Sequence, residues 1–241
     1  MVAAGRVDAS ARLARLDWNE IEGALWEFGY AKTPALVRAE ECRELAALYP
    51  DDARFRSTID MQRFRFGLGE YRYFAYPLPP LVAEMRAEAY RRLAPIAKRW
   101  TEALGGKAQF PSEIEAFLSR CHAGGQTRPT PLLLRYEAGG YNCLHQDLYG
   151  DIAFPLQITC FLSRPGEDYG GGEFLLVEQR PRSQSRGAAI TAAQGELVIF
   201  PNSERPVVGQ RGYYRAKVRH GVSRVAWGSR LTLGIIFHDA R

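Results

Sequence analysis

The sequence is poor in the residues with which proteins hold zinc or form disulfides. It has only four cysteines and four histidines among its 241 residues. The cysteines are Cys42, Cys121, Cys143 and Cys160. They form no CxxC pair and follow no regular spacing, which argues against a zinc ribbon and against a disulfide framework. We therefore expect reduced thiols that are mostly buried.

Long apolar segments are also missing. No apolar run approaches the roughly 20 residues that a helix needs to span a bilayer. The first residues, MVAAGRVDASARLARLD, lack the apolar region of a secretory signal. These absences predict no membrane contact and a cytoplasmic location. The formal net charge of +5 permits nucleic acid or another acidic partner but does not require one.

The first half of the chain has the pattern of helices. Helices are expected in residues 17–28, 38–48 and 79–104, with a shorter one after Pro111 towards Gly124. Asp17 is suited to cap the first helix, and Thr33-Pro34 separates the first from the second. Apolar residues at three- and four-residue steps give the third helix one buried stripe. Pro95 is expected to kink or split that helix.

From about residue 130, short apolar strands alternate with turn signals. The strand candidates are PLLLRY, FPLQITCFLS, GEFLLVEQ, GELVIF, YYRAKVRH and RLTLGIIFH. Short strands at this spacing are typical of a β-sandwich or barrel. No repeat or low-complexity linker interrupts the chain. We expect one domain over residues 1–241, in which a helical and hairpin layer (1–129) supports a β-fold (130–241).

The first candidates for a metal site are His145 and Asp147, within RYEAGGYNCLHQDLYG (135–150). Residues i and i+2 of a strand project to one face, so both side chains could reach the same ion. A second histidine would complete a 2-His-1-carboxylate site, which suits a divalent metal and leaves coordination positions open. A solvated loop pair is the alternative, because a lone HxD occurs readily by chance.

Three other histidines could provide the remaining ligand. His122 follows a helix and lies upstream of the HxD pair, and His238 lies three residues before the C-terminus. His220 ends a strand candidate and is followed ten residues later by Arg230, so the spacing favours His220. Arg230 could instead be a surface charge on an edge strand, where most arginines lie.

The alternation of residues in the last strand candidate predicts an anion site on one face of that strand. One face carries Arg230, Thr232, Gly234 and Ile236, and the other carries Leu231, Leu233, Ile235 and Phe237. A guanidinium can pair bidentately with a carboxylate, a hydroxyl adds a hydrogen bond, and a glycine leaves room. The first face therefore predicts a carboxylate pocket.

Together these residues resemble the iron(II)/2-oxoglutarate-dependent dioxygenases, with a layout most similar to the prolyl-4-hydroxylase-like group. The order of Tyr136, Gly140 and Tyr141 before the HxD pair, and the turn Gly171-Gly172-Glu173, are also similar. The resemblance covers about residues 130–240. It implies an α+β fold with an all-β core, a double-stranded β-helix or jelly roll with N-terminal helices, in agreement with the strand pattern.

The resemblance also implies roles for individual residues. It makes His145, Asp147 and His220 the iron(II) ligands and catalytic residues, and it assigns Arg230, Thr232, Tyr136 and Tyr141 to the cosubstrate 2-oxoglutarate, with O2 as co-reactant. The two tyrosines could equally be buried residues without such a contact. Related halogenases replace the carboxylate ligand, so the aspartate favours hydroxylation or oxidative dealkylation.

A narrower resemblance concerns the substrate. The stretches QTRPTPLLLRY, NCLHQDLYG, EQRPRSQSR, VRHGVSRV and TLGIIFHDA are similar to the bacterial family Oxygenase-NA, which has been predicted to act oxidatively on damaged nucleic acid. This resemblance implies nucleic acid as a partner. AlkB-type repair enzymes, however, place a second arginine shortly after the first, where this chain has Ile236.

Two segments could contact nucleic acid. One is the loop QRPRSQSR with Arg180, Arg182 and Arg186, and the other is MQRFRFGLGEYRYFAY (61–76), a predicted hairpin with Arg63, Arg65 and Tyr73. Arginines that bind phosphate and aromatic rings that stack on unpaired bases are typical of such contacts. A solvated loop and a hairpin that packs its aromatics on the core explain the same patterns.

Two other functions fit the sequence. The chain could hydroxylate a protein side chain, an amino acid or a small metabolite, or it could be a non-catalytic sensor of iron, oxygen or 2-oxoglutarate. A tight, mostly apolar cavity would favour a small substrate, and a broad basic groove would favour nucleic acid. Succinate formation would distinguish an enzyme from a sensor. The oligomeric state is left open.

Overall fold

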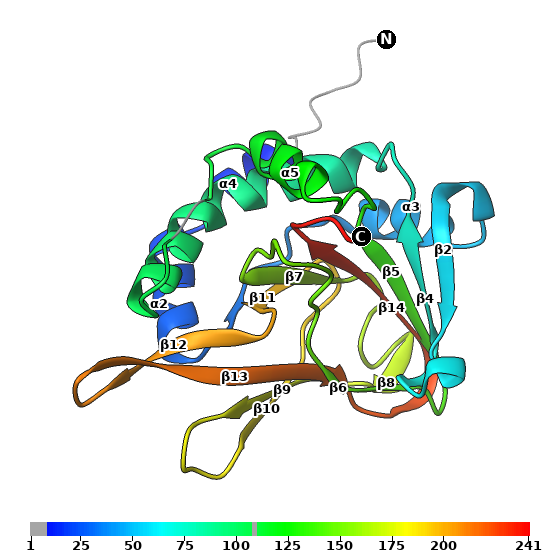
Figure 1. Ribbon diagram of the computed structural model, residues 1–241. Coiled ribbons are helices and arrows are strands. Elements are labelled where there is room, and N and C mark those ends of the chain that lie inside the picture. The colour runs from blue at the N-terminus through cyan, green and yellow to red at the C-terminus, as the bar shows by residue number, and fades with distance from the viewer. Residues whose placement is uncertain (1–8, 108–109) are drawn as a thin grey trace.

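The computed structural model describes residues 9–107 and 110–241. Two antiparallel sheets face each other, and the helices cover the outer face of the larger sheet (Figure 1). The helices are α1 (Ala9–Ala14), α2 (Trp18–Glu27), α3 (Ala39–Ala47), α4 (Pro80–Ala103) and α5 (Ile114–Ala123), with short 3-10 helices η1 (Asp52–Arg54) and η2 (Gln62–Phe64). None of these described helices is long and apolar enough to cross a membrane.

The larger sheet has the strand order β1-β11-β7-β14-β5-β4-β2, and β8 pairs with β14. Its strands are β1 (Ala31–Lys32), β2 (Phe55–Asp60), β4 (Glu70–Phe74), β5 (Leu132–Glu137), β7 (Leu156–Phe161), β8 (Tyr169–Gly171), β11 (Leu197–Pro201) and β14 (Val225–Ile236). The smaller sheet has the order β10-β9-β13-β6-β3, and β12 pairs with β13. Its strands are β3 (Gly67–Leu68), β6 (Tyr141–His145), β9 (Phe174–Gln179), β10 (Arg186–Ile190), β12 (Glu204–Gly209) and β13 (Gly212–Val222).

Four helices, α2 to α5, lie where the sequence predicts them, whereas α1 was not predicted. The Asp17 carboxylate caps α2 by accepting hydrogen bonds from the backbone N–H groups of Asn19 and Glu20. The prediction that Pro95 splits the long helix is wrong, because α4 continues through it as one helix of 24 residues. Pro95 lies on the exposed face, where water can satisfy the carbonyl group that the proline ring leaves without a donor.

The prediction of a hairpin over residues 61–76 is wrong in its first arm. Its second arm, β4, pairs with β2, which lies upstream of the predicted first arm. Between them, η2 follows a turn in which the Asp60 carboxylate accepts from the backbone N–H of Gln62, and Arg65 has a left-handed φ of 61°. β3 then leaves this sheet and pairs with β6 of the other one. The aromatic and basic residues before β3 therefore alternate along a turn, whereas those of β4 alternate along a strand, as predicted.

The alternation predicted for the last strand is present in β14. Leu231, Leu233, Ile235 and Phe237 belong to the main core, which also contains the inner faces of the helices. Arg230, Thr232, Gly234 and Ile236 face the space between the two sheets, where they line a cavity. A second apolar cluster between the sheets includes Phe174 and Phe200. All four cysteines are free thiols, and all except Cys143 are buried, as expected.

Candidate metal and cosubstrate site

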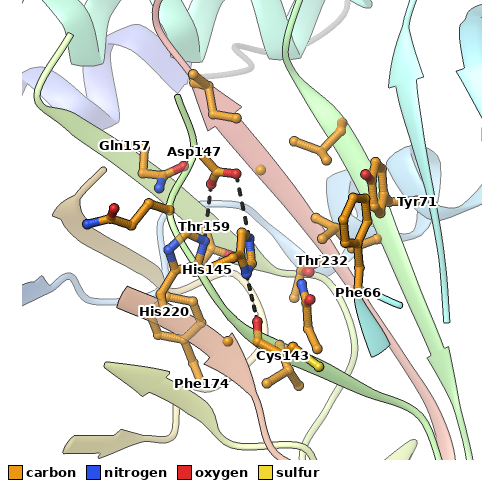
Figure 2. Close-up of a pocket in the computed structure, with 18 of the residues that line it drawn as sticks. Phe66, Tyr71, Cys143, His145, Asp147, Gln157, Thr159, Phe174, His220 and Thr232 are labelled. Carbon is orange, nitrogen blue, oxygen red and sulfur yellow. Dashed lines mark hydrogen bonds and ion pairs between the residues drawn. The ribbon is translucent and has the colours of Figure 1, made fainter. Parts of the chain in front are cut away.

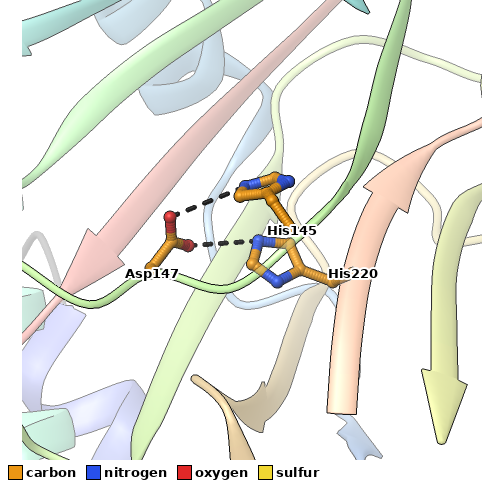
Figure 3. A group of neighbouring side chains, drawn as sticks. All are labelled: His145, Asp147 and His220. Atoms are coloured by element: carbon orange, nitrogen blue, oxygen red, sulfur yellow. Dashed lines mark ion pairs between the residues drawn. The ribbon is translucent and has the colours of Figure 1, made fainter. Parts of the chain in front are cut away.

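Three side chains meet between the sheets. His220 on β13 lies directly across from His145 at the end of β6. β6 ends there, so Asp147 extends from the loop that follows and not from the predicted strand. Its carboxylate oxygens lie 3.1 Å from Nε2 of His220 and 3.5 Å from Nε2 of His145 (Figure 3). One ligand atom from each residue lies within 4.8 Å of the others, so one ion can contact all three.

The protonation of these groups suits a divalent metal. Burial opposes ionisation of Asp147, but the two histidines outweigh it and hold the pKa of the carboxyl well below its usual range. Burial and the neighbouring His220 lower the pKa of His145, which favours the neutral imidazole that a metal needs. Nδ1 of His145 lies 2.8 Å from the carbonyl oxygen of Cys143, which leaves Nε2 as the lone-pair nitrogen facing Asp147. Two imidazoles and one carboxylate are a donor set that fits iron(II).

A chain of tyrosine hydroxyls orients the carboxylate. The hydroxyl of Tyr149 donates to Oδ1 of Asp147 at 2.7 Å, and the hydroxyls of Tyr73 and Tyr149 are 3.0 Å apart. Burial and the charge of Asp147 raise the pKa of Tyr149 well above its usual value, so this hydroxyl keeps its proton. Because Tyr149 binds Oδ1 of Asp147, the other oxygen, Oδ2, is turned towards His220. Neither Tyr149 nor this chain was predicted from the sequence, because a tyrosine in a loop carries no signal of such a role.

Tyr149→Phe is expected to weaken metal binding by about 10- to 100-fold, the usual effect of losing a hydrogen bond to a ligating carboxylate. Titration of the metal-free protein with cobalt(II), followed by absorbance, measures this directly. Tyr213→Phe, an exposed tyrosine outside the cavity, serves as control. Equal cobalt affinity in Tyr149→Phe and in the unmodified protein would show that the hydroxyl does not orient Asp147.

Arg230 is a buried cation that forms no ion pair with any described residue, although the charge of Glu173 acts on it from a longer distance. Its side chain is 1% exposed, and Nε and Nη2 have no hydrogen-bond partner among the described residues. The guanidinium carbon lies 5.1–5.9 Å from the ring centres of Phe161, Tyr136 and Tyr169. Burial lowers the pKa of Arg230, which shows that the charge is costly here, yet a guanidinium remains protonated in proteins. A buried charge in a cavity wall fits an anionic ligand such as the distal carboxylate of 2-oxoglutarate.

The backbone near Arg230 leaves room for this side chain. Gly172 has a left-handed φ of 65°, and a Cβ there would lie 2.9 Å from Cδ of Arg230. The glycine turn noted in the sequence therefore permits both the chain reversal and the close approach of the arginine. Thr232 and Tyr136 also line the cavity, whereas Tyr141 does not line it and is largely exposed. The hydroxyl of Tyr136 accepts a hydrogen bond from Nδ2 of Asn142 at 3.2 Å.

The cavity that holds these groups has a volume of about 390 Å³, within the range of small-ligand sites. Two of the residues proposed for substrate contact, Arg65 and Tyr73, line this cavity. Phe66 and Tyr71, which are close to them in the sequence, also line it (Figure 2). Arg63 is exposed outside it. The loop arginines are also outside: Arg180 pairs with Glu178, and Arg182 and Arg186 are exposed to solvent. The structure therefore does not place the QRPRSQSR loop at the cavity.

The other two histidines do not belong to the ligand group. Nε2 of His122 lies 2.9 Å from a carboxylate oxygen of Asp239, which also pairs with the buried Arg86. His238 is fully buried and accepts a hydrogen bond at Nδ1 from the backbone N–H of Phe154 at 3.2 Å. Burial, with a contribution from Arg86, lowers the pKa of His238 to about 4. The positions of both histidines indicate structural roles.

His238 predicts a loss of stability in acid. Between pH 6.5 and 4, His238 binds a proton in the unfolded chain but stays neutral in the folded protein. The free energy of unfolding therefore decreases as the pH falls through this range. The contribution is about 3 kcal/mol below pH 4, and the pKa of about 4 already includes the opposing charges of Asp147 and Asp239. His238→Asn keeps an acceptor for the backbone of Phe154 and cannot titrate. Urea unfolding at pH 7.5 and 4.5 should show a smaller pH effect in the variant, and equal effects would contradict the assignment.

Comparisons with known proteins agree with this geometry. Residues 69–240 match the model of the family Oxygenase-NA, described as an oxygenase catalysing oxidative methylation of damaged DNA. Two uncharacterized proteins of Mycobacterium tuberculosis, from strains CDC 1551 / Oshkosh and H37Rv, are each 48% identical over 167 residues, or 69% of this chain and 72% of theirs.

Solved structures share the fold at low sequence identity. A Pseudomonas putida prolyl-4-hydroxylase is 16% identical with a TM-score of 0.54, covering 93% of this chain and 99% of that one. A 2OG-Fe(II) oxygenase family oxidoreductase from Burkholderia pseudomallei is also 16% identical with a TM-score of 0.54, covering 94% of each chain. The epimerase SnoN, in complex with Fe3+, alpha ketoglutarate and nogalamycin RO, is 12% identical with a TM-score of 0.53, covering 91% of this chain and 82% of that one.

The facing sheets thus form the double-stranded β-helix fold that these oxygenase structures share, and the His-Asp-His group is a metal site of the kind that such an oxygenase needs. More narrowly, the chain belongs to the Oxygenase-NA family, as the sequence motifs predict.

Proposed function

We propose that this protein uses iron(II), 2-oxoglutarate and O2 to hydroxylate or oxidatively dealkylate a C–H bond in damaged nucleic acid. The observation that carries the cosubstrate assignment is Arg230, a buried cation in the wall of the cavity that holds the three candidate ligands. A distal carboxylate there would pair with the guanidinium and with the hydroxyl of Thr232. The non-catalytic sensor is set aside, because the chain belongs to an oxygenase family and carries a complete ligand set.

When bound, iron and 2-oxoglutarate supply the oxidation of the C–H bond by O2, with release of succinate and carbon dioxide. The chain contributes the geometry. His145, Asp147 and His220 would hold the ion, Arg230 would bind the cosubstrate, and the apolar walls would exclude water. Hydroxylation of a carbon bonded to a ring nitrogen gives an N–C–OH group that breaks down to an aldehyde and a free N–H. This chemistry removes an alkyl group, and it needs no methyl donor.

The surface around the cavity supports a nucleic-acid substrate. Phe64 and Phe66 are exposed and stacked, with ring centres 5.6 Å apart, and Phe66 also lines the cavity. Arg63 and Arg65 flank them and are exposed. Such rings can stack on an unpaired base while the arginines contact phosphate. A cavity of about 390 Å³ cannot take a duplex, so the damaged base would have to be unpaired or flipped out.

Oxidation of a small metabolite or side chain is the second candidate. The cavity is small and mostly apolar, and its charged lining residues are Arg65, Arg230 and Asp147. A small, mostly apolar cavity favours a small neutral substrate, or a small neutral part of a larger molecule, over a long charged one.

A succinate-release screen with iron(II) and 2-oxoglutarate tests both candidates. The panel contains single-stranded oligonucleotides with one alkylated base, the same oligonucleotides as duplexes, peptides and free amino acids. Stimulation by the single-stranded alkylated oligonucleotides above their unmodified forms would support the proposal. Stimulation only by peptides or amino acids would replace it with the second candidate.

A further inference from the structure

A buried amide in the cavity wall has no role in the site described above. Gln157 on β7 is 3% exposed and lines the cavity, and its Nε2 has no hydrogen-bond partner among the described residues. An unsatisfied buried N–H is costly, as much as about 1–3 kcal/mol. The cost is removed if a bound molecule accepts a hydrogen bond from it. Gln157 was not singled out in the sequence, although it alternates with Thr159 as a second polar residue in an otherwise apolar strand.

Gln157 lies at the end of the cavity away from the cosubstrate arginine. It pairs in register with Ile236, six residues beyond Arg230 along β14. At about 3.3 Å per residue, the backbones of Arg230 and Ile236 lie about 20 Å apart along the strand. Figure 2 shows Gln157 beside Asp147, whereas Thr232 lies past His145 on the other side of the ligand group. A group bound at Gln157 would therefore contact the metal site from the side that the cosubstrate leaves free.

The walls at this end fit a flat, neutral ring. They include Ile236, with Leu132 and Tyr73 on the adjoining strands. Tyr71, which is in register with Thr232, packs edge to face against Tyr73. Burial raises the pKa of Tyr71 to about 12, so its hydroxyl is uncharged at neutral pH. Apolar and aromatic walls with the unpaired N–H of Gln157 accept a neutral heteroaromatic ring that carries a carbonyl oxygen.

We infer that Gln157 determines which damaged base the protein accepts, by donating a hydrogen bond from Nε2 to a ring carbonyl oxygen. This inference rests on the proposed function and narrows it. The preferred substrates would be N-alkylated bases whose pairing edge bears a carbonyl group, such as 3-methylthymine and 1-methylguanine. A base with only an amino group on that edge, such as 1-methyladenine, would leave the amide without an acceptor.

The experiment compares three single-stranded oligonucleotides, each carrying one of these methylated bases, in the unmodified protein and in Gln157→Leu. Leucine has a similar size and suits the apolar walls, so the fold should persist. We expect the unmodified protein to prefer 3-methylthymine and 1-methylguanine by about 10-fold in kcat/KM, and the variant to lose this preference. Gln210→Leu, at an exposed position between β12 and β13 and outside the cavity, is the matched control.

Binding without turnover gives a second measurement. With cobalt(II) in place of iron(II), fluorescence anisotropy should show the same loss of preference in Gln157→Leu, while the affinities for cobalt(II) and 2-oxoglutarate stay unchanged. A preference for 1-methyladenine, or an equal loss for all three bases, would overturn the role of Gln157 and leave the proposed function intact. If no oligonucleotide stimulates succinate release but a peptide or amino acid does, the proposed function fails and this inference fails with it.

Discussion

Asp147→Ala and His145→Ala are each expected to abolish succinate formation while the protein stays folded. Asp147 supplies the carboxylate between the two histidines, with its oxygens 3.1 and 3.5 Å from their nitrogens. Without it, two imidazoles remain, and neither the charge nor the facial geometry needed for iron(II) is complete. Succinate release should fall below detection, and cobalt(II) titration should show the loss of the site independently of turnover.

The fold should tolerate these changes. Asp147 is buried in the wall of a cavity, and its removal eliminates a desolvated charge as well as its contacts, so the melting temperature should change little. Asp151→Ala is the control, because this aspartate is exposed four residues later and pairs only with Arg241 at the surface. Normal turnover in either ligand variant would disprove the metal assignment.

Much of this site could be predicted because local patterns encode it. Alternation in β14 separates Arg230 and Thr232 from the leucines of the core, and that pattern follows from the two-residue period of a strand. Spacing identified His220 as the partner of His145 over His122 and His238. The structure brings His220 and His145 together as a directly opposed pair on β13 and β6.

The rest depends on contacts between distant segments. The turn before β3 contains the alternating residues of a strand, but a capping carboxylate at Asp60 and the pairing of β3 with β6 decide its path. Tyr141 and the QRPRSQSR arginines were proposed for the site, yet they lie outside the cavity lining. Tyr141 is exposed although its neighbour Asn142 lines the cavity, and the arginines lie at the far end of β9 and β10. Gln157 and Tyr149 acquire their positions only when two sheets face each other.

Arg230→Met is expected to have opposite effects on cosubstrate binding and on stability. The KM for 2-oxoglutarate should rise by about 100-fold, because removal of one partner of a buried charge pair costs about 2–5 kcal/mol. If chemistry follows binding, kcat at saturating 2-oxoglutarate should change much less. Kinetics of succinate release over a range of 2-oxoglutarate concentrations measure both constants, and Arg186→Met, an exposed arginine outside the cavity, is the control.

Without 2-oxoglutarate, the same variant should be at least as stable as the unmodified protein. Two buried guanidinium nitrogens of Arg230 lack hydrogen-bond partners among the described residues, so the ligand-free fold bears the cost of this charge. A methionine of similar length removes that cost and keeps the contacts with Phe161 and Tyr169. A gain of about 1 kcal/mol would raise the melting temperature by about 2–4 °C. An unchanged KM would assign the carboxylate to another residue, and a lower melting temperature with a raised KM would make Arg230 a structural residue. The two measurements together therefore distinguish a cation kept for its ligand from one kept for the fold.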